Sequence, residues 1–279
     1  MEITHSMNGM IAWFPGQGSQ YVGMAKELLD SFKVARETFE EASDAADLNL
    51  RKLCLYGPEA ELMKTEYTQP ALLTASIAAF RVAQTETGFT PAVAAGHSLG
   101  EYSALVAAGA LPLSVAARWV RERGGAMQRA VPPGEGTMAA ILGLSDDTVG
   151  KLCQQASEEA RISRPTAAEY SHLTVEPIVQ PANFNAPHQV VIAGSADGIA
   201  HALRLIKESA DFKGGKAVPL AVSAPFHCRL MAPARAHMAD LFSQGGTATQ
   251  PRELAFPYLP NRTGRISRES SLILELLIE

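Results

Sequence analysis

The chain has 279 residues, of which 47% are hydrophobic and 19% are charged. These values are ordinary for a folded globular protein and exclude a disordered or collagen-like chain. The formal net charge of −5 argues against a general nucleic-acid binder, which needs a basic face to neutralise phosphates.

Targeting segments and cysteine pairs are missing from the sequence pattern. No apolar run approaches the roughly 18 residues that span a bilayer, and residues 1–10 lack the basic and apolar regions of a signal peptide. Cys54, Cys153 and Cys228 are widely spaced and match neither a zinc motif nor a disulfide framework. We therefore expect a cytoplasmic protein without a membrane segment or a metal site, and assign no function to the first six residues.

In the first half of the chain, short apolar runs alternate with segments of helical periodicity. The runs 10–14 and 91–95 each lead into a glycine-containing turn, which predicts two buried strands. Pro70 is interpreted as a helix start signal. The helices expected here cover residues 22–29, 33–47, 74–84, 101–110 and 113–129. The order of strand, sharp turn and helix around residues 96–100 is typical of α/β proteins.

A breaker cluster at residues 131–134 predicts a domain crossing. The following segment predicts an inserted sheet with two helices, and residues 161–181 are expected to form an irregular surface excursion. The expected strands are 138–142, 189–193 and 217–221, the helices are 145–159 and 197–209, and the chain then returns with a helix at 230–242 and a strand at 256–259. The sequence thus predicts a large domain of residues 8–132 and 223–279 and a small subdomain of residues 133–222.

Residues 96–100 read Gly-His-Ser-Leu-Gly, the pattern of a nucleophile elbow. A plain glycine-rich turn is the alternative, but a predicted strand before it and a helix after it favour a nucleophilic role for Ser98. The start of that helix directs free N–H groups at a developing oxyanion, so the N–H of Leu99 is the expected first donor.

A serine nucleophile needs a general base at neutral pH, and seven histidines compete for that role. His201 and His237 lie on predicted helices, where solvated or capping histidines are usual. His227 lies in the breaker-rich segment 223–228, where the chain re-enters the large domain. Chain context therefore favours His227 without deciding the choice.

Six separated motifs resemble, in order, the signature of the malonyl-CoA:acyl-carrier-protein transacylase family. The resemblance runs from about residue 10 to about residue 262. It implies an α/β-hydrolase-like large domain with an inserted ferredoxin-like small subdomain. The motifs are Phe14–Gln20, Tyr67–Ala71, Gly96–Glu101, Arg123–Gln128, Asn183–Asn185 and Ala224–His227.

The resemblance implies a role for each matching position. Ser98 corresponds to the nucleophile and His227 to its general base, which the family orients with a main-chain carbonyl instead of an acid. Gln17 corresponds to the residue whose backbone N–H completes the oxyanion hole with that of Leu99. Arg123 corresponds to the residue that clamps the malonyl carboxylate, a task suited to a two-pronged guanidinium; a solvated helix surface is its alternative.

Other matching positions imply the substrate. Gln69, Asn183 and Asn185 match loops where amides could contact the acyl group or the pantetheine arm, although ordinary loop amides look the same. Phe226 matches malonyl-selective members, in which its bulk excludes an α-methyl branch. The implied reaction moves malonyl from malonyl-CoA to the phosphopantetheine thiol of an acyl carrier protein without a cofactor. The pathway is fatty-acid or polyketide synthesis, and the excursion at 161–181 favours the polyketide type.

Two alternatives and one departure stay open at this point. A thioester hydrolase would share Ser98 and His227 but would not need Arg123, and a non-catalytic docking protein would need neither Ser98 nor His227. The resemblance persists through residues 261–264, whereas the last helix, strand and glycine-rich turn of the family are expected beyond Glu279. The sequence is therefore expected to be shortened, or to orient His227 in another way.

Overall fold

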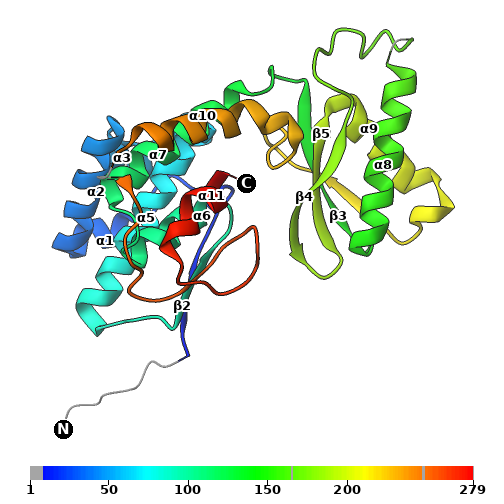
Figure 1. Cartoon of the computed structure of the whole chain (residues 1–279). Helices are drawn as coiled ribbons and strands as arrows, with labels where there is room; N and C mark the ends of the chain where they lie inside the picture. The colour runs from blue at the N-terminus through cyan, green and yellow to red at the C-terminus, as the bar shows by residue number, and fades with distance from the viewer. Residues whose placement is uncertain (1–8, 165, 247–248, 279) are drawn as a thin grey trace. The chain divides into compact units, whose positions relative to one another are not determined.

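The computed structural model describes residues 9–164, 166–246 and 249–278 (Figure 1). The N-terminal residues to which no function was assigned lie outside these ranges. The chain divides into two compact units, of which unit 1 contains the residues up to Gly125 and from His237, and unit 2 contains Ala126–Ala236. The expected domain boundaries near residues 132 and 223 stay a prediction.

Unit 1 is built on a parallel sheet of β1 (Ile11–Phe14), β2 (Val93–Gly96) and β7 (Tyr258–Leu259), with β2 in the centre. This arrangement confirms the expected α/β class. The unit boundaries fall within α7 and α10. The helices are α1 (Lys26–Ser31), α2 (Lys33–Ala46), α3 (Leu50–Tyr56), α4 (Glu59–Leu62), α5 (Thr65–Thr87), α6 (Leu99–Ala107), α7 (Leu113–Arg129), α10 (Ala232–Gln244) and α11 (Ile273–Ile278).

Aromatic side chains organise the core of unit 1. Phe80 on α5 makes edge contacts with Phe14 on β1 and with Phe256, at ring-centroid distances of 5.9 and 6.2 Å. Trp119 on α7 is fully buried and lies 4.4 Å from the ring of Phe242 on α10. These contacts bury large apolar surfaces between α5 and β1 and between α7 and α10. In the described ranges, no helix combines the length and apolar character that a bilayer crossing requires.

Strand β1 is only half buried, contrary to the expected buried strand. Ala12 and Phe14 belong to the core, whereas Ile11 and Trp13 are 58% and 66% exposed. Successive side chains of a strand point to opposite faces, and β1 pairs with β2 alone among the described strands. The apolar run therefore predicted the strand correctly, but it wrongly indicated that both faces of the strand are buried.

Pro70 does not start a helix. Helix α5 begins at Thr65 and continues through Pro70, which lies inside the helix. The Oγ1 of Thr68 donates to the carbonyl of Leu62, 2.6 Å away, so a side chain ties the preceding turn to the helix start. Pro70 is the sixth residue of α5, beyond the first turn, so the helix continues through it without the hydrogen bond that its missing N–H would make. The prediction failed because proline was read as the start of a helix that already begins at Thr65.

Unit 2 has an antiparallel sheet with the strand order β4-β5-β3-β6. Two helices connect the strands in the order strand, helix, strand, strand, helix, strand, which confirms the ferredoxin-like prediction. The elements are β3 (Gly136–Leu142), α8 (Asp146–Ser163), β4 (Val179–Ala186), β5 (Gln189–Ser195), α9 (Ala196–Glu208) and β6 (Lys216–Pro219).

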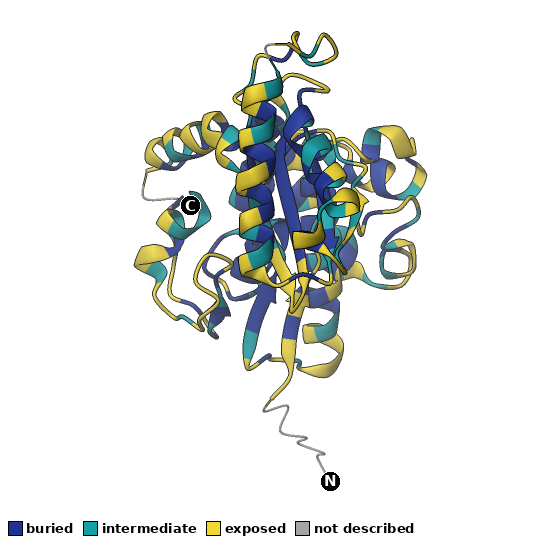
Figure 2. Cartoon of the chain, turned by 90° about the vertical axis from the view of Figure 1, so that its right-hand side faces the viewer, coloured by how far each residue is buried: buried dark blue, intermediate teal, exposed yellow. Residues whose placement is uncertain are grey.

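Both faces of this sheet are covered at its central strands, β3 and β5. Alternate residues of β3, Ala139 and Ile141, pack against the buried sides of α8 and α9. Met138 points to the opposite face, where it packs with residues of the segments 126–131 and 224–234. In Figure 2 the dark blue of buried residues follows mainly the central strands β3 and β5, and the helices carry exposed residues in yellow. The edge strands β4 and β6 are mostly intermediate or exposed.

Strand β4 was missed because its pattern is irregular. Asn183 pairs with Val191 of β5, and register shifts occur between Pro181 and Asn183 and between Phe184 and Ala186. Each shift interrupts the alternation that marks a strand in sequence. Asn183 and Asn185 therefore lie on a strand and not in a loop, which corrects the expectation.

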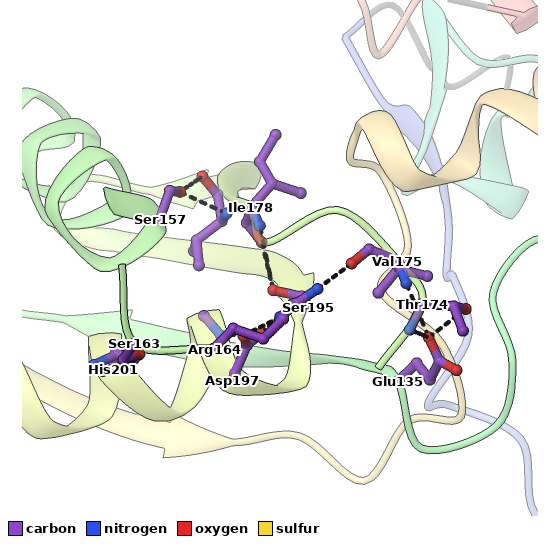
Figure 3. A network of polar contacts seen from close by, with 12 residues as sticks. Glu135, Ser157, Ser163, Arg164, Thr174, Val175, Ile178, Ser195, Asp197 and His201 are labelled. Atoms are coloured by element: carbon purple, nitrogen blue, oxygen red, sulfur yellow. Dashed lines mark hydrogen bonds and ion pairs between the residues drawn. The ribbon is translucent and has the colours of Figure 1, made fainter. Parts of the chain in front are cut away.

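The segment between α8 and β4 is irregular, as expected, although residues 161–163 and 179–181 of the expected excursion belong to α8 and β4. It is firmly tied to the unit (Figure 3). Arg164 donates from Nε and Nη2 to the two carboxylate oxygens of Asp197, each at 2.6 Å, and from Nη1 to the carbonyl of Val175. The carboxylate of Glu135 accepts hydrogen bonds from the backbone N–H and hydroxyl of Thr174, at 2.6 and 2.9 Å. An ion pair and hydrogen bonds to a carboxylate thus hold this segment in place of regular secondary structure.

We expect Asp197→Ala to destabilise the protein by about 3–5 kcal/mol, because it leaves the guanidinium of Arg164 without its buried partner. Asp197 is fully buried and Arg164 is 13% exposed. Urea denaturation followed by circular dichroism measures the loss. Asp146→Ala, at an exposed position in the first turn of α8, is the matched control and should cost less than about 1 kcal/mol. Equal losses in both variants would contradict the assignment.

Candidate active site

Ser98 occupies the turn between the end of β2 and the start of α6. Its backbone has φ 52° and ψ −103°, a region that residues other than glycine rarely adopt. The backbone N–H of the preceding residue, His97, donates to the carbonyl of Phe14 at 3.1 Å, which ties the turn to β1. The strained turn is the feature expected of a nucleophile elbow.

The glycines of the motif are required by close backbone approach. A Cβ on Gly96 would lie 2.0 Å from backbone atoms of Gly100. A Cβ on Gly100 would lie 2.3 Å from the carbonyl oxygen of Phe14. Neither position has room for a side chain, so the sequence pattern is explained by the geometry of the turn.

The two expected oxyanion donors belong to segments that meet at this turn. Leu99 is the first residue of α6, and the first N–H groups of a helix have no partner within it. Gly16 lies so close that a Cβ on it would be 2.6 Å from the carbonyl oxygen of His97. The neighbouring Gln17 donates from Nε2 to the hydroxyl of Thr65 at 3.1 Å. The donor roles of Gln17 and Leu99 stay predictions.

Arg123 lies beside the serine. Its Nη2 donates to the Oγ of Ser98 at 3.1 Å, and its Nη1 donates to the Oε1 of Gln69 at 2.8 Å. Its guanidinium carbon lies 5.7 Å from the ring centroid of Tyr102, which adds a cation–π contact. The cation is therefore held in place next to the candidate nucleophile and does not face water as an ordinary surface arginine.

A close packing of two helices makes this contact possible. A Cβ on Gly124 would lie 2.5 Å from the carbonyl oxygen of Thr65, so α7 approaches the start of α5 at its glycine. Gln69, one turn further along α5, is only 1% exposed. The expectation that Gln69 lies in a loop was wrong, because α5 begins before the motif and not after it.

A buried carboxyl group lies directly behind the turn. Glu101 is 5% exposed, and burial raises its pKa to about 7, although the N–H of Asn261 and the charge of Arg123 act in the opposite direction. Its Oε2 accepts from the backbone N–H of Asn261 at 3.2 Å, and its Oε1 has no hydrogen-bond partner among the described residues. The carboxyl thus changes its charge near neutral pH.

We expect Glu101 to contribute a loss of stability as the pH rises from about 4.5 through 7, and Glu101→Gln to remove that contribution. The folded state binds the Glu101 proton more tightly than the unfolded state does, so raising the pH removes a stabilising proton. The difference between wild type and variant amounts to about 3 kcal/mol across this window. Urea unfolding near pH 5 and near pH 8 measures it, with Glu40→Gln on the exposed side of α2 as the control. Parallel pH profiles for wild type and Glu101→Gln would refute the prediction.

The predicted base, His227, belongs to unit 2. It has φ 60°, again a conformation unusual for a residue with a side chain. Ala224 and Phe226, which precede it in the chain, are buried in the cluster that contains Met138. The Sγ of Cys228 lies 3.1 Å from the carbonyl oxygen of Pro225 and closes the turn. The fold therefore fixes the backbone of His227, while its role and that of Phe226 stay predictions.

A serine and a histidine lie in contact within unit 2 (Figure 3). The Oγ of Ser163 is 2.9 Å from Nε2 of His201, whose Nδ1 is 3.3 Å from a carboxylate oxygen of Glu159. Ser163 ends α8, and the negative end of a helix dipole disfavours an oxyanion. Ser98 instead precedes a helix start. We therefore assign the Ser163 group to the junction of α8 and α9 and keep Ser98 as the candidate.

Comparison with known proteins is consistent with this site. The family described as the acyl transferase domain matches residues 13–253. The malonyl CoA-acyl carrier protein transacylase of Escherichia coli O157:H7 is 47% identical over 226 residues, which cover 81% of this chain and 67% of that protein. The chain belongs to the malonyl-CoA:acyl-carrier-protein transacylase family. The resemblance stated from the motifs is confirmed.

Solved transacylase structures share the fold. The malonyl CoA-acyl carrier protein transacylase of Coxiella burnetii superposes with a TM-score of 0.84 at 38% identity, over 97% of this chain and 78% of that chain. A malonyl-transacylase solved in complex with the acyl-carrier protein of a type II polyketide synthase gives 0.83 at 40% identity, over 97% and 80%. The mixed α/β architecture is therefore that of the transacylases.

The structure brings together part of the predicted transacylase site. Ser98, Arg123 and Gln69 form one connected group in unit 1, and Gln17 and Leu99 adjoin the same turn. Four other predicted residues belong to unit 2: Asn183, Asn185, Phe226 and His227.

Sequence reasoning gave no role to Asn261 or to the carboxyl of Glu101. One signal for Asn261 was its place two residues after an apolar strand, at the carboxyl edge of a parallel sheet.

Proposed function

We propose that the chain is a malonyl-CoA:acyl-carrier-protein S-malonyltransferase that carries the malonyl group on Ser98. The observation that supports this most strongly is the guanidinium of Arg123, 3.1 Å from the Oγ of Ser98. A fixed cation beside the nucleophile suits an acyl group that ends in a free carboxylate. Gln69, which holds the other arm of the guanidinium, would keep it aligned.

The proposed reaction has two half-reactions. The Oγ of Ser98 attacks the thioester carbonyl while His227 takes the hydroxyl proton. The C–S bond then breaks, and coenzyme A leaves with that proton. In the second half, His227 takes the proton from the carrier thiol, the sulfur attacks the serine ester, and Ser98 recovers its hydroxyl. The N–H groups of Leu99 and Gln17 would stabilise both oxyanions, each typically by about 2.7–4 kcal/mol.

The remaining predicted residues concern the substrate. Asn183 and Asn185 are proposed to contact the acyl group or the pantetheine arm, and Phe226 to exclude a branched acyl group. The acyl donor is malonyl-CoA and the acceptor an acyl carrier protein, in fatty-acid or polyketide synthesis. Cys54, Cys153 and Cys228 are free thiols, which supports a reducing cytoplasmic location.

The proposal is tested by intact-protein mass spectrometry. The protein is mixed with malonyl-CoA, methylmalonyl-CoA or acetyl-CoA, and a phosphopantetheinylated carrier protein is then added. We expect a malonyl adduct that is stable until the carrier is added and that then moves to the carrier. If an acetyl adduct forms and is lost to water instead, the chain is a thioester hydrolase. If no adduct forms with any donor, the transferase proposal is wrong.

A further inference from the structure

A side chain from the neighbouring strand end bridges the turn that carries Ser98. Strands β2 and β7 run parallel, with Ala95 opposite Leu259, so both strands end at the same edge of the sheet. Asn261 lies two residues after β7. Its Oδ1 accepts from the N–H of Ser98 at 2.8 Å, and its Nδ2 donates to the carbonyl of Gly96 at 2.6 Å. One carboxamide therefore joins the backbone on both sides of His97.

We infer that Asn261 is a positioning residue for the nucleophile, an inference that rests on the acyl-serine function proposed above. Ser98 has a backbone conformation that persists only where its surroundings over-determine it. The two hydrogen bonds from Asn261 supply such a constraint from outside the turn. They hold the backbone of Ser98 at φ 52° and ψ −103°, directly before the first residue of α6.

The carboxamide of Asn261 matches both backbone groups. The carbonyl of Gly96 needs a donor and the N–H of Ser98 needs an acceptor, and asparagine provides one of each. A carboxylate would accept from Ser98 but would repel the carbonyl oxygen of Gly96. Because Asn261 occupies the N–H of Ser98, stabilisation of the oxyanion falls to other donors, such as the N–H of Leu99.

The anchor itself is fixed. The backbone N–H of Asn261 donates to the Oε2 of Glu101 at 3.2 Å, and the carbonyl of the preceding Pro260 accepts from the N–H of Gly264 at 2.9 Å. Helix α6, which begins after Ser98, therefore holds the residue that holds Ser98. Such a closed arrangement keeps the nucleophile in one geometry.

The first test compares Asn261→Ala with Asn49→Ala. The reaction rate of Ser98 is measured with a fluorophosphonate probe, from which the serine oxygen displaces fluoride, and with malonyl-CoA by mass spectrometry. We expect Asn261→Ala to lower both rates by about 10- to 100-fold, with an unchanged KM for malonyl-CoA. Asn49 caps α3 by accepting from the N–H of Lys52, so Asn49→Ala loses stability without touching Ser98 and should keep both rates. Wild-type rates in Asn261→Ala, or equal losses in both variants, would overturn the inference.

The second test restores the donor with a proton. A neutral carboxylic acid can donate to Gly96 and accept from Ser98, so Asn261→Asp should recover at low pH. The ionisable groups that interact with Glu101 beside this turn are Arg123, Tyr102 and Tyr258. Glu101 itself changes charge near neutral pH, so the substitution is made in the Glu101→Gln background and compared with Glu101→Gln alone.

We expect the ratio of their probe rates to rise about tenfold from about pH 8 to about pH 5. Titration of the general base affects both proteins and cancels in the ratio. A constant ratio would show that the donor to Gly96 is unimportant. If the wild type reacts with the probe but not with malonyl-CoA, the proposed substrate fails while the probe rates still decide the role of Asn261.

Discussion

Ser98→Ala should abolish the malonyl adduct and lower carrier malonylation by a factor of about 10⁴ or more, because the covalent route is lost. The variant keeps the size of the side chain closely, so the turn between β2 and α6 should persist. Intact-protein mass with malonyl-CoA and the initial rate of carrier malonylation measure the effect.

Ser163→Ala is the matched control for this prediction. Ser163 also contacts a histidine, His201, which in turn contacts Glu159. Its position at the end of α8 lacks the favourable end of a helix dipole, so the variant should form the adduct at the wild-type rate. An adduct that survives in Ser98→Ala but disappears in Ser163→Ala would transfer the nucleophile to unit 2.

Arg123→Ala should lower kcat/KM for malonyl-CoA by about 10²- to 10³-fold, because the malonyl carboxylate loses a charge-assisted partner. Acetyl-CoA carries no free carboxylate, so its slow loading should change much less and the preference for malonyl should shrink. Arg123→Lys should recover only part of the loss, since a lysine cannot contact Gln69 and a carboxylate with a planar fork. Competition between the two donors, read by mass, measures the preference.

Arg118→Ala is the control for Arg123. Arg118 lies on the same helix at an exposed position, so the variant removes the same charge without changing the surroundings of Ser98. We expect its preference for malonyl to equal that of the wild type. If both variants lose the preference equally, the preference comes from the summed positive charge of α7 and not from direct binding of the malonyl carboxylate by Arg123.

The sequence predicted the nucleophile turn well because its glycines leave a visible pattern within five residues. Gly96 is needed for its close approach to the backbone of Gly100, four positions away, whereas Gly100 is needed for its approach to the distant Phe14 of β1. Arg123 carried no local signal, since a helix with several arginines normally faces water. Its role followed from the family resemblance, and the structure supports it through the contacts with Ser98 and Gln69.

Features that depend on distant partners were not predictable from the pattern. Strand β4 pairs with β5 despite its register shifts. Trp13 is apolar but exposed, because the burial of a side chain on β1 depends on whether another part of the structure covers that face. The contact of Asn261 with the turn joins residues that are 163 positions apart. No periodicity within a short window reports such a contact.

The placement of Asn261 late in the chain also affects folding of the protein during its synthesis on the ribosome. Unit 2 is one continuous stretch with two hydrophobic clusters of its own, so it can begin to fold before β7 is made. The 163 positions between Ser98 and Asn261 take roughly 10 to 30 s to translate. For that interval the nascent chain carries its serine without the carboxamide that bridges the turn. We therefore expect the full reactivity of Ser98 to appear only after β7 and Asn261 have left the ribosome.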